Sequence, residues 1–389
     1  MTAAALRMPA VSGQSRITAI DALRGLVILL MLVDHTREFF FLHAQVSDPM
    51  DVATTEPALF FTRLAAHLCA PVFVALTGLA AWLYGDAKGG PGHASAFLFK
   101  RGLFLVVLEW TVINFAWTFD PTPATVFLQV IWVIGLSMIA LSVLLYLPRA
   151  ALIAIGLAIV LGHNLLDPIT VAREEWGYTA WTVLHDRNYL DLPWGGAART
   201  SYPLLPWIGV IALGYAIGPW FAPGTDASGR RRKLLATGFG SLALFALLRT
   251  INLYGEPLRW MAGETPLATL MSVLNLTKYP PSADFLLLTL GAGALLLVAF
   301  ERLPRRVTGG LVVFGSAPLF FYILHLYLLH LLNLLAGQIW APAGAGLISV
   351  PDVASVWLLS AAVAIPCWFA CRWFAKRKRA SSAWWMRYL

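Results

Sequence analysis

Long apolar segments recur along the whole chain, and they constrain the fold more than any other feature. They lie at 19–42, 60–84, 97–119, 124–146, 150–166, 203–221, 234–253, 282–300, 309–335 and 353–375. A helix that crosses a bilayer needs about 20 apolar residues. The chain is also 59% hydrophobic and only 12% charged, whereas a soluble domain is about 25% charged. We therefore predict an all-α, polytopic integral membrane protein with ten transmembrane helices.

Positive charge alternates between the loops that join these segments. If the N-terminus lies in the cytoplasm, the cytoplasmic loops hold most Lys and Arg residues, including the run at 230–233 and the C-terminal tail. The outer loops are then balanced or acidic, as at Asp48, Asp51 and Glu56. This pattern follows the positive-inside rule and predicts that both termini are cytoplasmic. It also accounts for the net charge of +8 without nucleic acid as a partner.

Three regions are expected along the chain. They are a cytoplasmic N-terminal tail at 1–16, a single transmembrane domain at 17–375 and a basic cytoplasmic C-terminal tail at 376–389. The N-terminal tail has no apolar core of the kind that a cleavable signal peptide requires. The first apolar segment is therefore predicted to act as an uncleaved insertion signal.

The cysteines give no sign of a metal site. Cys69, Cys367 and Cys371 all lie in apolar segments, and no CxxC or CxxxH spacing occurs. Such spacings are typical of zinc sites, so no metal is predicted. We expect buried thiols that fill space in the core.

The first apolar segment carries an unusual number of ionisable residues for a membrane helix. At 100° per residue, four of them fall on one helix face: Asp21, Arg24, His35 and Glu38. Charge inside a bilayer is costly, so this polar stripe must face other protein segments or a water-filled cavity.

The two ends of the polar stripe predict different chemistry. Arg24 and His35 are about 16 Å apart along a helix axis, with Arg24 near the cytoplasmic face. A cation there could hold an anionic donor, while an imidazole further out could take up a proton or an acyl group. Asp34 lies on the flank of the stripe, and Arg37 is expected to point away toward the outer headgroups. The alternative, strongest for Asp21 and Arg24, is an ion-pair network that only orients helices.

Polar residues also interrupt later apolar segments. Arg63 and His67 are spaced i, i+4 in the second segment. Glu109 is deep in the third segment, where it either lines a site or forms a structural pair. A second histidine follows His325 after five residues, about 140° around a helix. The two cannot easily face one cavity, and we favour His325 for a functional role.

Two loops are candidates for substrate contacts. The outer loop at 167–202 is rich in aromatic residues, which could stack on a sugar or form an interfacial belt. The sequence GGPGH at 89–93 lies close to Lys88, Lys100 and Arg101. These residues could contact phosphates from the cytoplasm, and a plain loop is the alternative.

Several segments between residues 17 and 335 carry a resemblance to known proteins. They are IDALRGLVILLMLVDHTREFF, FFTRLAAHLCAPVFVALTG, RGLFLVVLEWTVINFAWTF, YPLLPWIGVIALGYAIG, TKYPPSADFLLLTLG and FFYILHLYLLH. Together they resemble bacterial membrane proteins grouped with the heparan-α-glucosaminide N-acetyltransferase catalytic domain. The LRG motif with a histidine eleven residues after its arginine also looks like acyltransferase family 3, in which that arginine and histidine are functional. Arg24 and His35 match this spacing.

The resemblance implies a membrane acyltransferase that moves acetyl from cytoplasmic acetyl-CoA to a sugar on the other side. It also brings in His43 as a second candidate, because the family's acetyl-linked histidine precedes an alanine, as His43 precedes Ala44. We expect an envelope glycan or another outward acceptor, a bacterial plasma (inner) membrane, and a homodimer as one assembly to consider.

The functional hypothesis is acyl transfer from acyl-CoA to a hydroxyl or an amine. The predicted catalytic residues are His35, Asp34, Glu38 and His43. The predicted donor-binding residues are Arg24, Arg101 and Lys100, and the predicted substrate-binding residues are Arg63, His67, Glu109 and His325. The alternatives are a secondary transporter that uses the polar stripe for solute or protons and a scaffold or lipid-binding protein without turnover.

Overall fold

The chain folds into a helical bundle with one small β-sheet. The structure, a computed structural model, describes residues 18–41, 50–340, 348–381, 383 and 386. The α-helices are α1 (Thr18–Phe40), α2 (Pro57–Ala66), α3 (Cys69–Lys88), α4 (Pro91–Leu108), α5 (Asn114–Thr118), α6 (Val130–Leu144), α7 (Arg149–Gly162), α8 (Tyr178–Leu184), α9 (Leu205–Ala216), α10 (Ala227–Ile251), α11 (Pro266–Leu274), α12 (Ala283–Arg302), α13 (Arg305–Gly315), α14 (Pro318–Trp340) and α15 (Val353–Ala380). A π-helix, η2 (Glu109–Ile113), and two 3₁₀ helices, η3 (His163–Leu166) and η4 (Gly218–Phe221), join some of them.

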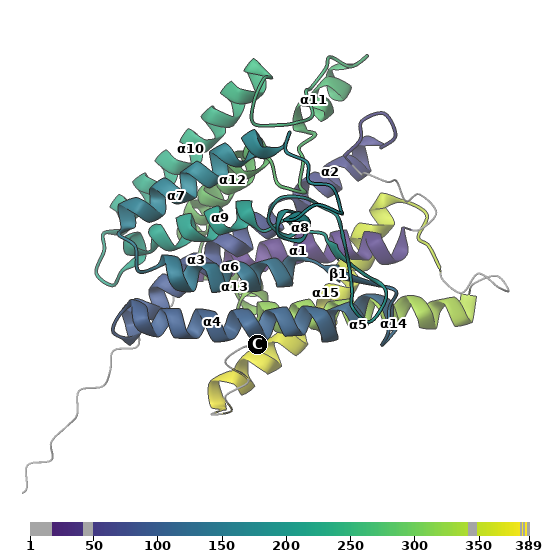
Figure 1. The fold of residues 1–389 in the computed structure, drawn as a ribbon. Helices are drawn as coiled ribbons and strands as arrows, with labels where there is room; N and C mark the ends of the chain where they lie inside the picture. The colour runs from purple at the N-terminus through teal and green to yellow at the C-terminus, as the bar shows by residue number, and fades with distance from the viewer. Residues whose placement is uncertain (1–17, 42–49, 341–347, 382, 384–385, 387–389) are drawn as a thin grey trace, which may run out of the picture.

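Helix α1 crosses the middle of the bundle (Figure 1) and contacts α2, α3, α12, α13, α14 and α15. Its contact with α13 is so close that it needs glycine on both sides. A Cβ atom on Gly25 would lie 2.0 Å from the Leu311 carbonyl oxygen, and one on Gly315 would lie 1.8 Å from the Asp21 carbonyl oxygen. Small residues at helix contacts are typical of membrane bundles. Three residues of the polar stripe, Asp21, Arg24 and His35, are buried or half-buried in this bundle, whereas Glu38 is exposed.

Two of the long segments expected as single helices are divided instead. The second predicted segment consists of α2 and α3, which meet at His67 and Leu68. Pro71 has no N–H to donate to the His67 carbonyl, so the α-helical ladder cannot continue through this point. The ninth predicted segment is likewise divided into α13 and α14, and α14 begins at Pro318.

A three-stranded sheet corrects the prediction of an all-α fold. Strand β1 (Thr125–Leu128) pairs in parallel with β3 (Ala197–Thr200), and β3 pairs antiparallel with β2 (Tyr189–Asp191). The fourth predicted segment therefore begins as a strand, and its helix α6 starts only at Val130. The sheet fixes the 187–202 segment, expected as a plain loop, against the start of α6.

Six helical stretches are long and apolar enough to cross a membrane. They are Pro57–Lys88, Arg149–Leu166, Ala227–Ile251, Ala283–Arg302, Pro318–Trp340 and Val353–Ala380. Two shorter apolar helices, Val130–Leu144 and Leu205–Phe221, add to them. These helices indicate an integral membrane protein. The full set of ten spans and the cytoplasmic position of both termini stay predictions.

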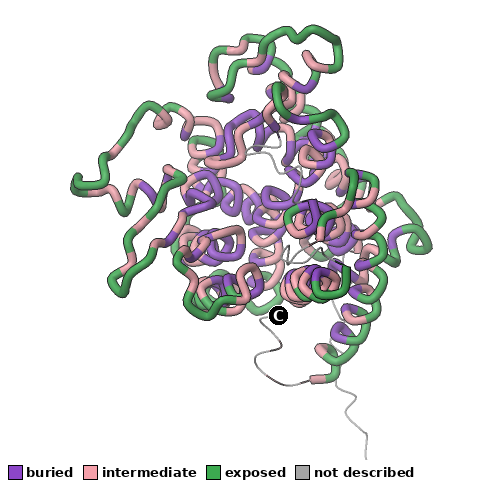
Figure 2. The backbone as a smooth tube through the Cα atoms, turned by 90° about the vertical axis from the view of Figure 1, so that its right-hand side faces the viewer, coloured by how far each residue is buried: buried purple, intermediate pink, exposed green. Residues whose placement is uncertain are grey.

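Burial separates the interior from the outer helix faces (Figure 2). Large apolar side chains such as Phe239, Leu358 and Phe369 are exposed on α10 and α15, which suits a surface that faces lipid. Inside, the three cysteines are buried and free, which confirms the expectation of space-filling thiols. The predicted tail at 1–16 and His43 lie outside the described residues, whereas α15 continues to Ala380 and includes the basic residues at 376–379.

Candidate functional site

A cavity of about 760 Å³ opens beside the C-terminal half of α1. Most of its lining comes from α1, α2, α3, α4, α5, α6 and α14 and from the segments at 187–202 and 275–279. The ionisable groups in its wall are Asp34, His35, Arg37, Glu38, Arg63, His67, Arg101, Arg187, Arg199, Lys278, Tyr202, Tyr279 and Tyr322. Concave pockets in which a few polar groups converge are where small molecules bind, so this cavity is the candidate site.

Asp34 is the centre of an ion-pair cluster at the cavity wall. Its carboxylate accepts a hydrogen bond from Arg63 of α2, and its Oδ1 atom lies 3.3 Å from Arg37 Nε. Arg37 also pairs with Glu38. The prediction that Arg37 points to the outer headgroups is wrong, because its side chain is only 4% exposed and lies beside Asp34 at i, i+3. A buried carboxylate needs such partners to remain charged.

His35 and His325 form a hydrogen-bonded pair that links α1 to α14. His35 Nδ1 lies 2.7 Å from His325 Nε2, and His325 Nδ1 lies 2.8 Å from the Phe321 carbonyl oxygen. A carbonyl can only accept, so His325 carries its proton on Nδ1 and its Nε2 is an acceptor. His35 must then donate from Nδ1. This series of hydrogen bonds leaves the lone pair of His35 on Nε2.

The His35 ring is also held by aromatic neighbours. Trp117 meets it edge-on at a centroid distance of 5.1 Å, and Tyr322 does so at 5.9 Å. His35 lines the cavity, as do Trp117 and Tyr322. The nitrogen with the lone pair is thus the one available to a molecule bound in the cavity, because Nδ1 is occupied by His325.

Three further cations line the cavity from the segments between helices, Arg187 and Lys278 from loops and Arg199 from β3. Arg187 lies 4.5 Å from the ring centre of Tyr279, Lys278 lies 5.3 Å from the same ring, and Arg199 lies 5.4 Å from the ring of Tyr189. Among the described residues, none of the three cations forms an ion pair with a carboxylate. We call Arg187, Arg199 and Lys278 the loop cations.

The electrostatics of this wall favour negative charge. Burial lowers the pKa of Arg187, and the neighbouring Arg199 lowers it further. Burial by itself would raise the pKa of Tyr279, but the cations Lys278 and Arg63 outweigh it and lower that pKa. The lowered pKa of Tyr279 and the effect of Arg199 on Arg187 are both expected where positive charge is in excess, so an anionic group would be stabilised here.

Six predicted site residues meet at the cavity: Asp34, His35, Glu38, Arg63, His67 and Arg101. His43 is outside the described residues, and the remaining four predicted residues lie elsewhere. Arg24 donates to the Leu76 carbonyl oxygen at 3.3 Å and pairs with Asp21 at 3.5 Å. Lys100 is exposed on α4, and His325 lies behind His35 as described above.

Glu109 lies in the π-helix η2 and not in the cavity wall. It is fully buried, and its Oε2 atom accepts a hydrogen bond of 2.9 Å from the Trp132 backbone nitrogen at the start of α6. This placement agrees with the structural-pair alternative. His330 is the second histidine of α14, and its Nδ1 atom lies 2.8 Å from the Ala116 carbonyl oxygen. Because a carbonyl can only accept, His330 donates this hydrogen bond.

Sequence reasoning missed the loop cations and Tyr279. Arg187 and Arg199 were part of a loop whose mixed charges gave no direction, and Lys278 belonged to no apolar segment. The strand pairing of β3 with β1 and β2 places Arg199 at the cavity. The sequence carried only a weak signal for these cations. Several basic residues lie in loops that the charge pattern assigns to one side of the membrane.

Comparison with known proteins identifies the family. The family model for heparan-alpha-glucosaminide N-acetyltransferase, catalytic, matches residues 16–248, which is more than half of the chain. No curated protein matches the chain. The matched region contains Asp34, His35, Arg63 and two of the loop cations, while Lys278 and His325 follow it. The chain belongs to the heparan-alpha-glucosaminide N-acetyltransferase catalytic family, and this membership implies a membrane acetyltransferase.

Proposed function

We propose that the protein transfers an acetyl group from acetyl-CoA to a hydroxyl or amine acceptor in the α1 cavity, with His35 as the reacting base. The observation that carries this proposal is the series of hydrogen bonds from the Phe321 carbonyl through His325 to His35. It sets the tautomer of His35 and leaves a basic nitrogen for the cavity. A general base must reach the proton that it removes, and it must be unprotonated when it does so.

Two routes are compatible with this base. In direct transfer, His35 Nε2 takes the acceptor proton while the acceptor oxygen or nitrogen attacks the thioester carbonyl, and CoA leaves as the thiolate. In the covalent route, Nε2 attacks the thioester carbonyl and CoA leaves as the thiolate. The acceptor oxygen or nitrogen then attacks the acetyl carbon, the bond from that carbon to Nε2 breaks, and the freed Nε2 takes up the acceptor proton. Both routes put positive charge on His35. Asp34, the neighbouring carboxylate, would stabilise that charge.

The substrates would approach from opposite sides. Arg101 lines the cavity from α4, with Lys100 next to it, and these two residues are the proposed contacts for donor phosphates. The loop cations come from segments that the charge pattern places outside, so we assign them to an acceptor on the outer side. Arg63 and His67 would complete the acceptor wall. The family name makes a glucosaminide the first acceptor to test.

The test compares variants of two histidines. Purified wild-type protein, His35→Gln and the control His330→Gln are incubated with radiolabelled acetyl-CoA and glucosamine, and released CoA and labelled sugar are measured. We expect His35→Gln to lose about 10²–10⁴ of the rate, as for a missing general base, and His330→Gln to remain close to wild type. Full activity in His35→Gln would contradict the proposal.

The transporter alternative has its own outcome. The same protein in vesicles would move glucosamine without acetyl-CoA if the cavity served transport, and no acetylated sugar would form. Label that stays on wild-type protein but not on His35→Gln would favour the covalent route over direct transfer.

A further inference from the structure

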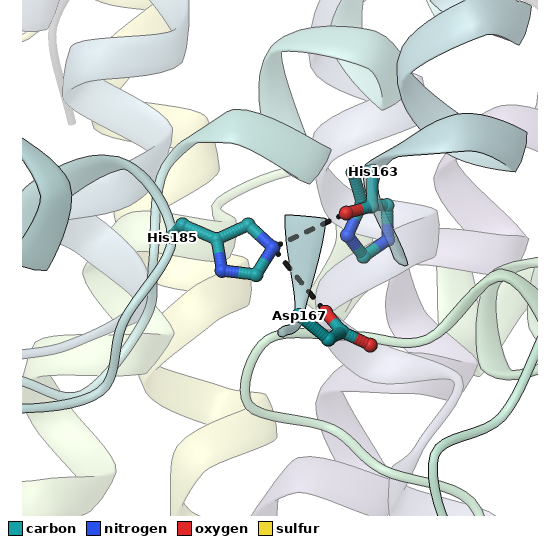
Figure 3. A group of neighbouring side chains, drawn as sticks. All are labelled: His163, Asp167 and His185. Atoms are coloured by element: carbon teal, nitrogen blue, oxygen red, sulfur yellow. Dashed lines mark hydrogen bonds and ion pairs between the residues drawn. The ribbon is translucent and has the colours of Figure 1, made fainter. Parts of the chain in front are cut away.

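A second group of histidines lies outside the cavity. His163 lies in η3 at the end of α7, Asp167 follows that turn, and His185 follows α8 (Figure 3). One ligand atom from each residue lies within 4.8 Å of the other two. We call these three residues the outer triad. None of them lines the α1 cavity, so the acetyl-transfer chemistry gives them no role.

His163 has an environment that needs explanation. It is only 2% exposed. The Pro281 backbone lies near its ring, but neither ring nitrogen makes a hydrogen bond of normal geometry with a residue that the structure describes. A buried polar group without a partner destabilises a fold. A ligand bound to one ring nitrogen would remove that cost.

Asp167 and His185 are already oriented toward the same point (Figure 3). His185 Nε2 lies 3.3 Å from Asp167 Oδ1 and 3.3 Å from the His163 carbonyl oxygen. Both oxygens accept, so without a metal this nitrogen donates its proton to them, and a bound metal ion would displace that proton. A tetrahedral zinc ion separates neighbouring ligands by about 3.4 Å. The Asp167–His185 distance matches this value. The ligand atoms of the triad lie within 4.8 Å of one another, so the widest separation would have to shorten by about 1.4 Å at most.

A second layer of polar residues supports the triad. Asn164 Nδ2 donates to Asp167 Oδ2 at 2.9 Å, and Asn164 Oδ1 accepts from the Ala283 backbone nitrogen at 2.8 Å. This leaves Asp167 Oδ1 for the centre of the triad. On the far side of His185, Nδ1 lies 3.5 Å from Asp186 Oδ1. An imidazole that binds metal with one nitrogen commonly gives its other N–H to a carboxylate in this way.

We propose that His163, Asp167 and His185 bind one divalent transition-metal ion, with zinc as the best fit. Two imidazole nitrogens and one carboxylate oxygen are the donor types that zinc accepts. The prediction of no metal rested on the cysteine spacings, which carry no information about these three residues. The ion would join the end of α7 to the segment after α8, which carries Arg187 and Arg199. The metal is therefore structural, and it holds the outer wall of the cavity in place.

The experiment uses full-length protein without a histidine tag, in detergent, after treatment with a chelator. Zinc is titrated calorimetrically, and cobalt(II) is used as a spectroscopic probe for the coordination geometry. We expect one ion per chain in the wild type and at least a tenfold weaker affinity in His163→Ala and in Asp167→Asn. The exposed His93 of α4 provides the matched control, and His93→Ala should bind as the wild type does.

The outcomes separate metal binding from an ion pair. Equal binding in wild type and His163→Ala would overturn the proposal, since the ion would then sit elsewhere. No binding by chelator-treated wild type would overturn it as well, and the triad would be an ion pair between His185 and its neighbouring carboxylates. His35→Gln should keep the wild-type affinity, which excludes the His35–His325 pair as the metal site. The thermal midpoint should rise on zinc addition in the wild type but not in His163→Ala.

Discussion

The two ends of α1 carry similar residues in different surroundings. At the N-terminal end, Arg24 is held by Asp21 and the Leu76 carbonyl, and Gly315 packs directly on the Asp21 carbonyl. At the C-terminal end, Asp34 and His35 are also held by partners, but they face a cavity of about 760 Å³. The comparison shows that a polar helix face is not a site by itself. What packs opposite each turn decides whether it orients helices or meets a ligand.

Replacing Asp34 should have the largest effect at the C-terminal end of α1. Asp34→Asn leaves Arg63, a nearly buried cation, without its carboxylate, and breaking a buried pair typically costs about 3–5 kcal/mol. We expect a large fall in the free energy of unfolding, seen as a lower thermal midpoint in detergent. Asp21→Asn is the matched control at the N-terminal end, where a smaller loss is expected because the Arg24 side chain is 21% exposed. Equal losses in both variants would remove the distinction between the ends.

Replacing His325 tests whether it positions His35. His325→Phe keeps a ring of similar shape but cannot accept the Nδ1–H of His35. Leaving that donor unpaired costs about 1–3 kcal/mol, which corresponds to a fall in kcat of roughly tenfold to a hundredfold. The KM values should change little, since His325 does not line the cavity. A variant with normal kcat and raised KM would instead support the predicted role of His325 in substrate binding.

Replacing Lys278 asks which substrate meets the loop cations. If they bind the acceptor, Lys278→Met should raise the KM for glucosamine 6-sulfate about tenfold, as for a lost hydrogen bond to a charged group. The KM for unsulfated glucosamine should change less. The control is Arg173→Met, since Arg173 is paired with Asp191 on an exposed part of the same outer segment. A rise only in the KM for acetyl-CoA would assign the loop cations to the donor.

Replacing Arg24 should have the smallest effect. Its side chain is already satisfied within α1 and α3, and partly exposed ion pairs contribute about 0–1 kcal/mol. We expect Arg24→Gln to keep its kcat and its KM for acetyl-CoA within about fivefold of wild type. A KM for acetyl-CoA raised well beyond this range would restore the predicted donor-binding role of Arg24 and make the two ends of α1 functionally equal.

Much of the architecture could be predicted because it depends on local properties. Apolar length located the membrane helices, and helical periodicity identified the face of α1 that carries His35. The breaks within the predicted helices were harder to predict. The break at His67 depends on one missing N–H, at Pro71, as well as on packing. The small sheet could not be predicted, because β1 and β3 are four-residue strands more than sixty residues apart.

The sequence by itself was enough for the membrane class, the family resemblance and the choice of α1 as the central helix. Only the tertiary structure showed that Arg37 turns toward Asp34, that His325 sets the tautomer of His35, and that the loop cations reach the cavity. The physical reason is distance along the chain. Periodicity tells which residues share a face over three or four positions, but His35 and His325 are 290 positions apart. Their contact follows from the close packing of many helices, which no local pattern encodes.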